Sequence, residues 1–176
     1  MRKYKDFAES KDSSERKNAV YLFLEQMEKR YNLYDQRREK LEEKEEAELS
    51  DKEKWQLEHS EDKKDCLAEM HNAVIEAFEN KDMDFGIKKI KKIKQDNPDA
   101  FKSFNMFSKS HLQDFYAECK NILKTAKEVF KAAEEQGKQI FLPPLPEKLE
   151  TSYHLDNDSE FGFSDSEDDN RSSFGM

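Results

Sequence analysis

The amino-acid sequence predicts an all-α protein, a helical bundle of four or five helices followed by a proline-rich segment and a disordered acidic C-terminal tail. Only 4 of its 176 residues are glycine and 4 are proline, and both residue types interrupt helices. Charged residues make up 40% of the chain and hydrophobic residues 35%, so the core must be narrow. Over most of the chain, apolar residues recur every three or four positions, which is the period of an amphipathic helix.

The charge distribution divides this chain into a body and a tail. Residues 147–176 hold nine acidic residues against two basic ones, a net charge of −7, which leaves −2 of the total −9 for residues 1–146. We therefore expect a flexible N-terminus (1–13), one helical domain (14–142), and a proline-rich segment with a disordered acidic tail (143–176). A nearly neutral body with an acidic tail makes nucleic acid an unlikely partner.

The first helix is expected to begin near Glu15, capped by Ser13 or Ser14. Beyond Asp35 it has few apolar residues, so this half should project or lie lightly on the body. A Ser-x-x-Glu capping box at Ser50 indicates that a helix restarts there, although one helix could also run straight through. The polar stretch 58–65 is a place where the next helix can break. The apolar stripe of the first helix is Val20, Phe23, Leu24, Met27, Tyr31 and Tyr34.

The second half of the body has clearer helix boundaries. A short helix should run from Met83 to about residue 95 and stop at Asn97 and Pro98, with Pro98 in the first turn of another helical piece. The clearest helix spans 110–136 and ends at Gly137, where a left-handed residue is favoured. We expect this helix to be central. The long first helix and Trp55 could also serve an intermolecular coiled coil, so the oligomeric state stays open.

Catalytic and metal-binding patterns are missing from the sequence. No His pair stands at i,i+4, and neither Cys-x-x-Cys, Glu-x-x-His nor a Gly-rich phosphate loop occurs. We therefore predict no catalytic residue, cofactor or metal. Cys66 and Cys119 occupy apolar stripe positions and should be small buried hydrophobic residues. A catalytic pair of either cysteine with His71 or His111 could arise only through folding, so an enzyme assembled in three dimensions remains an alternative.

A basic stretch at 86–94 alternates isoleucines with lysines. It could lie on anionic lipid or contact an acidic partner through its lysines. Alternatively, its isoleucines close the bundle and its lysines are solvated. Isoleucines exposed to solvent would favour the membrane interpretation. The candidate contact residues are Lys88, Lys89, Lys91 and Lys92.

The most specific motif is the proline-rich run at 142–148. Prolines preset a polyproline II helix, which SH3 domains bind when a Pro-x-x-Pro core is followed by a basic residue, and the Pro-Pro-Leu-Pro run also resembles a type of WW-domain ligand. A stiff spacer that ends the helical domain is the alternative. The candidate partner-binding residues are Pro143, Pro144, Leu145, Pro146 and Lys148.

The tail has two further features. Ser164 and Ser166 each have an acidic residue three positions later, the pattern that acidophilic kinases phosphorylate. The last thirty residues also resemble the C-terminal translocation signals of substrates (effectors) of the Dot/Icm type IVB secretion system. The residues that carry this resemblance are Glu160, Asp165, Glu167, Asp168, Asp169 and Phe174. It implies a bacterial protein delivered into a eukaryotic cytosol.

Together, these features predict a non-enzymatic protein-protein interaction protein, with an anionic-membrane-associating helical module as the alternative. No run of about 20 apolar residues and no apolar signal region occurs. Two cysteines far apart do not suggest a disulfide framework. We expect a cytoplasmic location, or secretion into a host cell if the resemblance holds.

Overall fold

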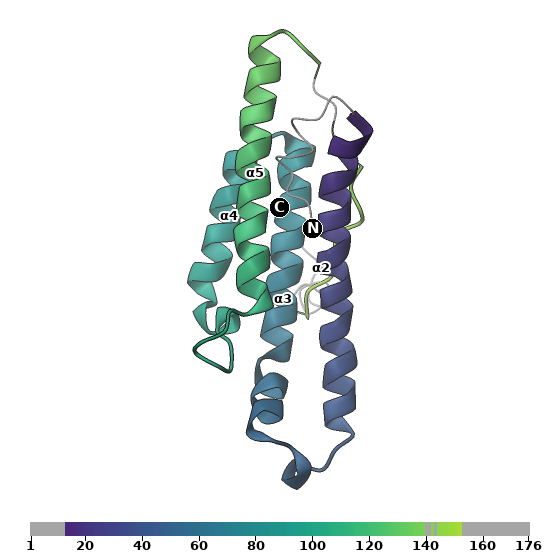
Figure 1. The fold of residues 1–176 in the computed structure, drawn as a ribbon, viewed down its shortest axis with the longest axis vertical. Coiled ribbons are helices and arrows are strands. Elements are labelled where there is room, and N and C mark those ends of the chain that lie inside the picture. Colours follow the sequence, from purple (N-terminus) through teal and green to yellow (C-terminus); the bar gives the residue numbers. More distant parts are fainter. Residues whose placement is uncertain (1–12, 140–141, 143, 153–176) are drawn as a thin grey trace, which may run out of the picture.

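The computed structural model describes residues 13–139, 142 and 144–152, and it confirms the all-α class. Within these residues no strand occurs, and the helices form an elongated bundle (Figure 1). The elements are α2 (Ser13–Glu42), η1 (Glu46–Glu48), α3 (Asp51–Asn80), α4 (Met83–Asp96), η2 (Pro98–Phe101) and α5 (His111–Glu135), where η marks a 3-10 helix.

Helices α2 and α3 form a long antiparallel hairpin (Figure 1). Its far half, which holds the end of α2 and the start of α3 and is here called the distal hairpin, extends past α4 and α5. The predicted capping box is present, since the Ser50 hydroxyl accepts from the Glu53 amide and the Glu53 carboxylate accepts from the Ser50 amide. Helix α3 does not break across its polar stretch. Lys63 in that stretch is buried and bonded to carbonyl groups of the neighbouring η2 region, so one side of the stretch faces protein.

The central helix is α3, and the expectation that 110–136 would be central is wrong. Helix α3 packs against α2, α4, α5 and η2, and both of its faces are therefore covered. Helix α5 packs on one side of α3, so a single apolar stripe is enough to cover its contacts with the bundle. The Phe23 and Phe115 rings join α2 to α5 at a centroid distance of 5.9 Å, and the Phe78 and Phe130 rings join α3 to α5 at 6.0 Å.

The predicted ends of α4 and α5 are confirmed. The Asp82 carboxylate caps α4 by accepting from the Phe85 amide, and the Ser110 hydroxyl caps α5 by accepting from the Gln113 amide. Gly137 follows α5 with a φ of 65°, in the left-handed region that favours glycine.

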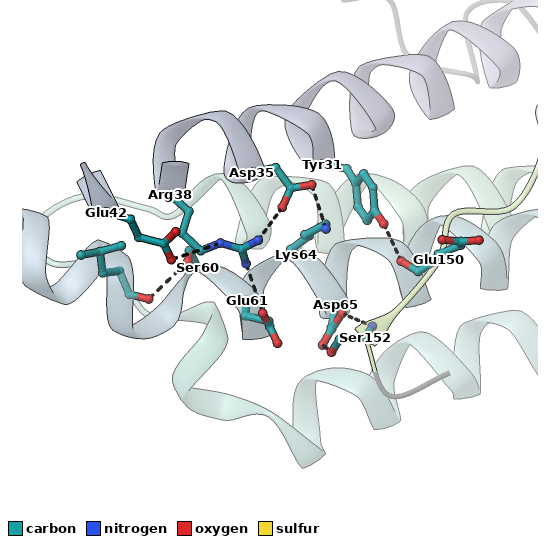
Figure 2. Close-up of polar contacts among 11 residues, drawn as sticks. Tyr31, Asp35, Arg38, Glu42, Ser60, Glu61, Lys64, Asp65, Glu150 and Ser152 are labelled. Atoms are coloured by element: carbon teal, nitrogen blue, oxygen red, sulfur yellow. Dashed lines mark hydrogen bonds and ion pairs between the residues drawn. The ribbon is translucent and has the colours of Figure 1, made fainter. Parts of the chain in front are cut away.

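Residues 144–152, here called the strap, run in extended form along the seam between α2 and α3. Asn72 on α3 donates to the Leu149 carbonyl at 2.7 Å and accepts from the Leu149 amide at 2.8 Å. The Tyr31 hydroxyl on α2 donates to the Glu150 carbonyl at 2.7 Å (Figure 2). These three hydrogen bonds go to backbone groups of the strap. Helices α2 and α3 therefore hold this part of the strap by its peptide units.

The end of the strap departs from expectation. We expected the chain from about Leu149 to bury too little surface to order on the bundle, and this is wrong for residues 149–152. Thr151 is only 7% exposed. The Asp65 carboxylate accepts from the Ser152 amide at 3.0 Å and from its hydroxyl at 2.6 Å (Figure 2). Side-chain hydrogen bonds to the backbone, in addition to apolar burial, offset the entropy of ordering.

Candidate functional site

A cleft of about 950 Å³ lies between the distal hairpin and the loop at 102–110 that joins η2 to α5. Residues of α2, α3, this loop and the start of α5 line it. We call it the basic cleft, because among the described residues that line it none is Asp or Glu. Six of the lining residues are lysine or arginine, namely Arg30, Arg37, Arg38, Lys52, Lys63 and Lys109.

Most of this positive charge has no counter-charge. Arg38 is the exception, since its guanidinium pairs with Asp35 at 3.2 Å and with Glu61 at 3.1 Å, which joins α2 to α3 (Figure 2). The other five cations have no ion pair with any residue in the described part of the chain; they are Arg30, Arg37, Lys52, Lys63 and Lys109. A protein with a net charge of −9 therefore holds a concentrated positive site.

Lys63 is the most constrained of these cations. Its side chain is buried, with 7% of the residue exposed, and its ammonium donates to the Ala100 carbonyl at 2.6 Å and the Lys102 carbonyl at 2.7 Å. The ammonium also lies 5.1 Å from the centre of the Trp55 ring. Burial lowers the pKa of Lys63 to about 8, because the charged form loses hydration and no carboxylate replaces it.

The positive charges converge at the start of α5. The Arg30 nitrogen Nη1 is buried and has no hydrogen-bond acceptor in the described part of the chain, and burial lowers the pKa of this guanidinium. The pKa of His111 is lowered, first by burial and then by the charge of Arg30, with Arg37 and Lys63 adding to the effect and Asp114 opposing it. Three cationic side chains from two helices thus act on His111 at the start of α5.

Aromatic side chains form part of the wall of the basic cleft. Trp55 stacks on His59 at a centroid distance of 4.7 Å and meets the edge of Phe104 at 5.9 Å. Tyr34 lines the α2 side. In the loop, Phe104 is 47% exposed and Met106 is 85% exposed. The cleft can therefore bind an anionic group and an apolar or flat group at the same time.

Hydrogen bonds hold the loop at 102–110 in place. The Ser103 hydroxyl donates to the Ser108 carbonyl at 2.6 Å, and the Asn105 side chain accepts from the Phe107 amide at 2.9 Å. The Ser110 hydroxyl also donates to the Phe101 carbonyl at 2.8 Å, which ties the end of the loop to η2. The loop side of the cleft is thus preformed.

The lysines of the predicted basic stretch lie on α4, away from the basic cleft. Ile90 and Ile93 are buried and Ile87 packs against the core, so the isoleucines close the bundle. This is the opposite of the exposed isoleucines that the membrane interpretation needs. Three of the four lysines, Lys88, Lys91 and Lys92, are exposed, whereas Lys89 is half-buried and pairs with Glu76 at 2.9 Å.

The proline-rich motif is placed only in part. Pro143 lies outside the described residues, and Pro144 is exposed. Leu145 packs against the core, and Lys148 pairs with Glu76 at 3.2 Å. The described residues 144–148 of the motif therefore lie on the bundle as part of the strap. The predicted phosphorylation and secretion-signal residues also fall outside the described residues; they are Glu160, Ser164, Asp165, Ser166, Glu167, Asp168, Asp169 and Phe174.

Both cysteines are buried, as predicted. Burial raises the pKa of the Cys66 thiol to about 12, and the pKa of Cys119 is raised as well, so neither thiol is activated as a nucleophile. His71 is also buried, and burial lowers its pKa. Across the described residues, no cluster of His, Cys, Asp and Glu is arranged to hold a metal ion, and no helix is long and apolar enough to cross a membrane.

Sequence reasoning missed the basic cleft entirely. One signal was present: Arg30, Tyr34 and Arg37 stand at i, i+4 and i+7, on one face of α2. Acidic residues such as Glu28, Asp35 and Glu39 stand near them in the sequence and concealed it. No protein-family model matches this chain, and neither the curated proteins nor the solved structures compared with it include a similar one.

Proposed function

We propose that this protein is a non-enzymatic binding protein whose basic cleft takes up an acidic segment of a partner protein. One observation carries the proposal: five cations line the cleft without an ion pair to any described residue, and among the described lining residues there is no carboxylate. Such an arrangement costs stability in the free protein. A bound anion offsets part of that cost, so binding an acidic ligand is favourable at this place.

The shape of the cleft supports an extended protein segment as the ligand. Its volume of about 950 Å³ accommodates several side chains, and the loop with Phe104 and Met106 offers exposed apolar contacts beside the cations. A long nucleic acid is disfavoured, because residues 1–146 together carry a net charge of −2 and offer no overall positive charge to a long phosphate backbone.

Intrinsic fluorescence tests the proposal, since Trp55 is the only tryptophan and lies in the cleft wall. Titration with a deca-glutamate peptide should change Trp55 emission saturably, whereas deca-lysine should not. Replacing both Arg30 and Arg37 by Gln should weaken binding about tenfold or more, because each removes a charged hydrogen-bond donor. The affinity should also fall as salt is added.

A matched control replaces Lys88 and Lys91 by Gln, which removes the same charge from the exposed face of α4. This variant should bind deca-glutamate within about twofold of the wild type, since exposed distant charges are screened. Equal weakening in the two double variants would show a diffuse charge effect and would contradict the proposal. An absence of any saturable response would contradict it as well.

A second candidate function uses the strap. Pro144 is exposed and Pro146 half-exposed, so the proline-rich run can be met by an SH3 or WW-type domain, but Lys148 must first leave Glu76 and Leu145 must leave the core. Affinity capture from a eukaryotic lysate with intact chain and with Pro146→Ala tests this candidate. A partner lost only from the variant supports it, and identical captured proteins count against it.

A further inference from the structure

We propose that the basic cleft selects a phosphate ester carried on an aromatic ring, as in a phosphotyrosine of the acidic partner segment. The inference rests on the proposed function and specifies the chemical group that the cleft recognises. Three properties of the cleft lead to it: a buried donor without an acceptor, an aromatic wall, and more positive charge than single carboxylates would neutralise.

The first property is the position of the unused donor. Nη1 of Arg30 is buried and has no acceptor in the described part of the chain, so a ligand that satisfies it must place an oxygen beneath the cleft surface. Aspartate, glutamate and phosphoserine carry their oxygens close to the ligand backbone. A phosphate at the far end of a tyrosine ring reaches deeper, and its oxygens suit the fork of a guanidinium.

The second property is the aromatic wall. Three aromatic residues line the cleft, namely Tyr34 on α2 and the Trp55 and Phe104 pair, whose own rings meet edge to face at 5.9 Å, so a ring that enters the cleft would meet aromatic side chains. Aromatic rings gain from such contacts beyond the area they bury. A carboxylate has no ring to place against these side chains, whereas a phosphotyrosine has one.

The third property is the amount of uncompensated charge. Arg30, Arg37 and Lys63 line the same cleft as His111, so several cations meet in one region. A phosphate monoester carries a charge of about −1.5 to −2 near neutral pH, so one phosphate neutralises more of this charge than one carboxylate. The preformed loop at 102–110 also lowers the cost of ordering the site when the ligand binds.

The test uses four peptides, Glu-Glu-Xaa-Glu-Glu, in which Xaa is tyrosine, phosphotyrosine, phosphoserine or glutamate. Trp55 emission reports binding to the full chain. We expect the phosphotyrosine peptide to bind about 30-fold more tightly than the tyrosine peptide, as a charge-assisted bidentate pair provides. It should bind about tenfold more tightly than the phosphoserine peptide, because only the former places a ring on the aromatic wall.

Two conservative variants show whether the guanidinium geometry matters. Arg30→Lys retains the charge and should reduce the preference for phosphotyrosine over tyrosine from about 30-fold to about threefold or less, since an ammonium cannot form the bidentate pair. Lys88→Arg exchanges the same two residue types at an exposed position of α4 outside the cleft, and it should leave the preference intact.

The outcomes separate this inference from the proposed function. If the phosphotyrosine, phosphoserine and glutamate peptides bind equally well, the inference is overturned while binding of an acidic segment stands. If phosphotyrosine and phosphoserine are equal and both exceed glutamate, the ring is not recognised and the inference is also overturned. If no peptide, including the glutamate peptide, gives a saturable response, the proposed function itself fails.

Discussion

Replacing Lys63 by methionine should change how the stability of the protein depends on pH. Lys63 has a pKa of about 8 in the folded protein and about 10.5 when unfolded, because burial removes hydration from the ammonium without supplying a carboxylate. Below pH 8 Lys63 is protonated in both the folded and the unfolded protein, and burial of its charge lowers the free energy of unfolding by the full amount. Between pH 8 and pH 10.5 the unfolded state binds more protons than the folded state, so stability rises with pH.

The size of this effect follows from the two pKa values. A difference from 10.5 to about 8 corresponds to about 3 kcal/mol at 1.36 kcal/mol per unit. Relative to Lys63→Met, the free energy of unfolding of the wild type should therefore rise by about 3 kcal/mol between pH 8 and pH 10.5. Most of this rise should be complete by pH 10. Other groups that titrate there are common to both proteins and cancel in the difference.

Urea unfolding followed by circular dichroism at pH 7, 8, 9 and 10 measures the difference directly. The variant Lys88→Met is the control, since Lys88 is exposed on α4, and its pH profile should parallel that of the wild type. A constant difference between wild type and Lys63→Met from pH 7 to pH 10 would refute the reasoning, because it would mean that Lys63 keeps its proton in the fold.

Three further substitutions have expected results. Asn72→Ala removes both hydrogen bonds to Leu149, about 2 kcal/mol together, so amide exchange of Leu149 should accelerate about 30-fold. Gly86→Ala would place a Cβ only 2.6 Å from that of Ala77, and it should lower the free energy of unfolding by about 1–2 kcal/mol despite the better helix propensity of alanine. Ser50→Ala removes the cap of α3 and should cost about 1 kcal/mol in urea unfolding.

Controls for these substitutions come from the same helices. Asn80→Ala on α3 lies at an exposed position outside the strap and should leave exchange of Leu149 unchanged. Lys91→Ala on exposed α4 surface should change stability by less than about 0.5 kcal/mol, in contrast to Gly86→Ala. A neutral Gly86→Ala, or slow Leu149 exchange in Asn72→Ala, would contradict the packing and strap contacts described above.

The features that were predictable from sequence are local along the chain. The capping box of Ser50 and Glu53, the cap at Asp82 and the left-handed Gly137 each depend on residues within a few positions, so the pattern determines them. The isoleucines of α4 also faced the core, as their spacing of three allows.

The strap and the basic cleft depend on contacts between distant residues. Asn72 and Leu149 are 77 positions apart in the sequence. Nothing near either residue indicates that the Asn72 side chain binds the backbone of Leu149. The cations of the cleft come from α2, α3 and the loop at 102–110, and those on the two helices have acidic neighbours that hide them in the sequence. Likewise, the polar stretch around Lys63 suggested a break in the helix, although burial against η2 keeps it continuous.

The most direct test of the basic cleft is a nuclear magnetic resonance titration of the His111 imidazole, with and without saturating deca-glutamate. In the free protein its pKa should be below the ordinary value for histidine, because of burial and the nearby charges of Arg30, Arg37 and Lys63. Binding of the acidic peptide should raise this pKa, and by linkage the affinity should increase as the pH falls through it. A His111 pKa that does not move on saturation would place the peptide elsewhere and contradict the proposed site.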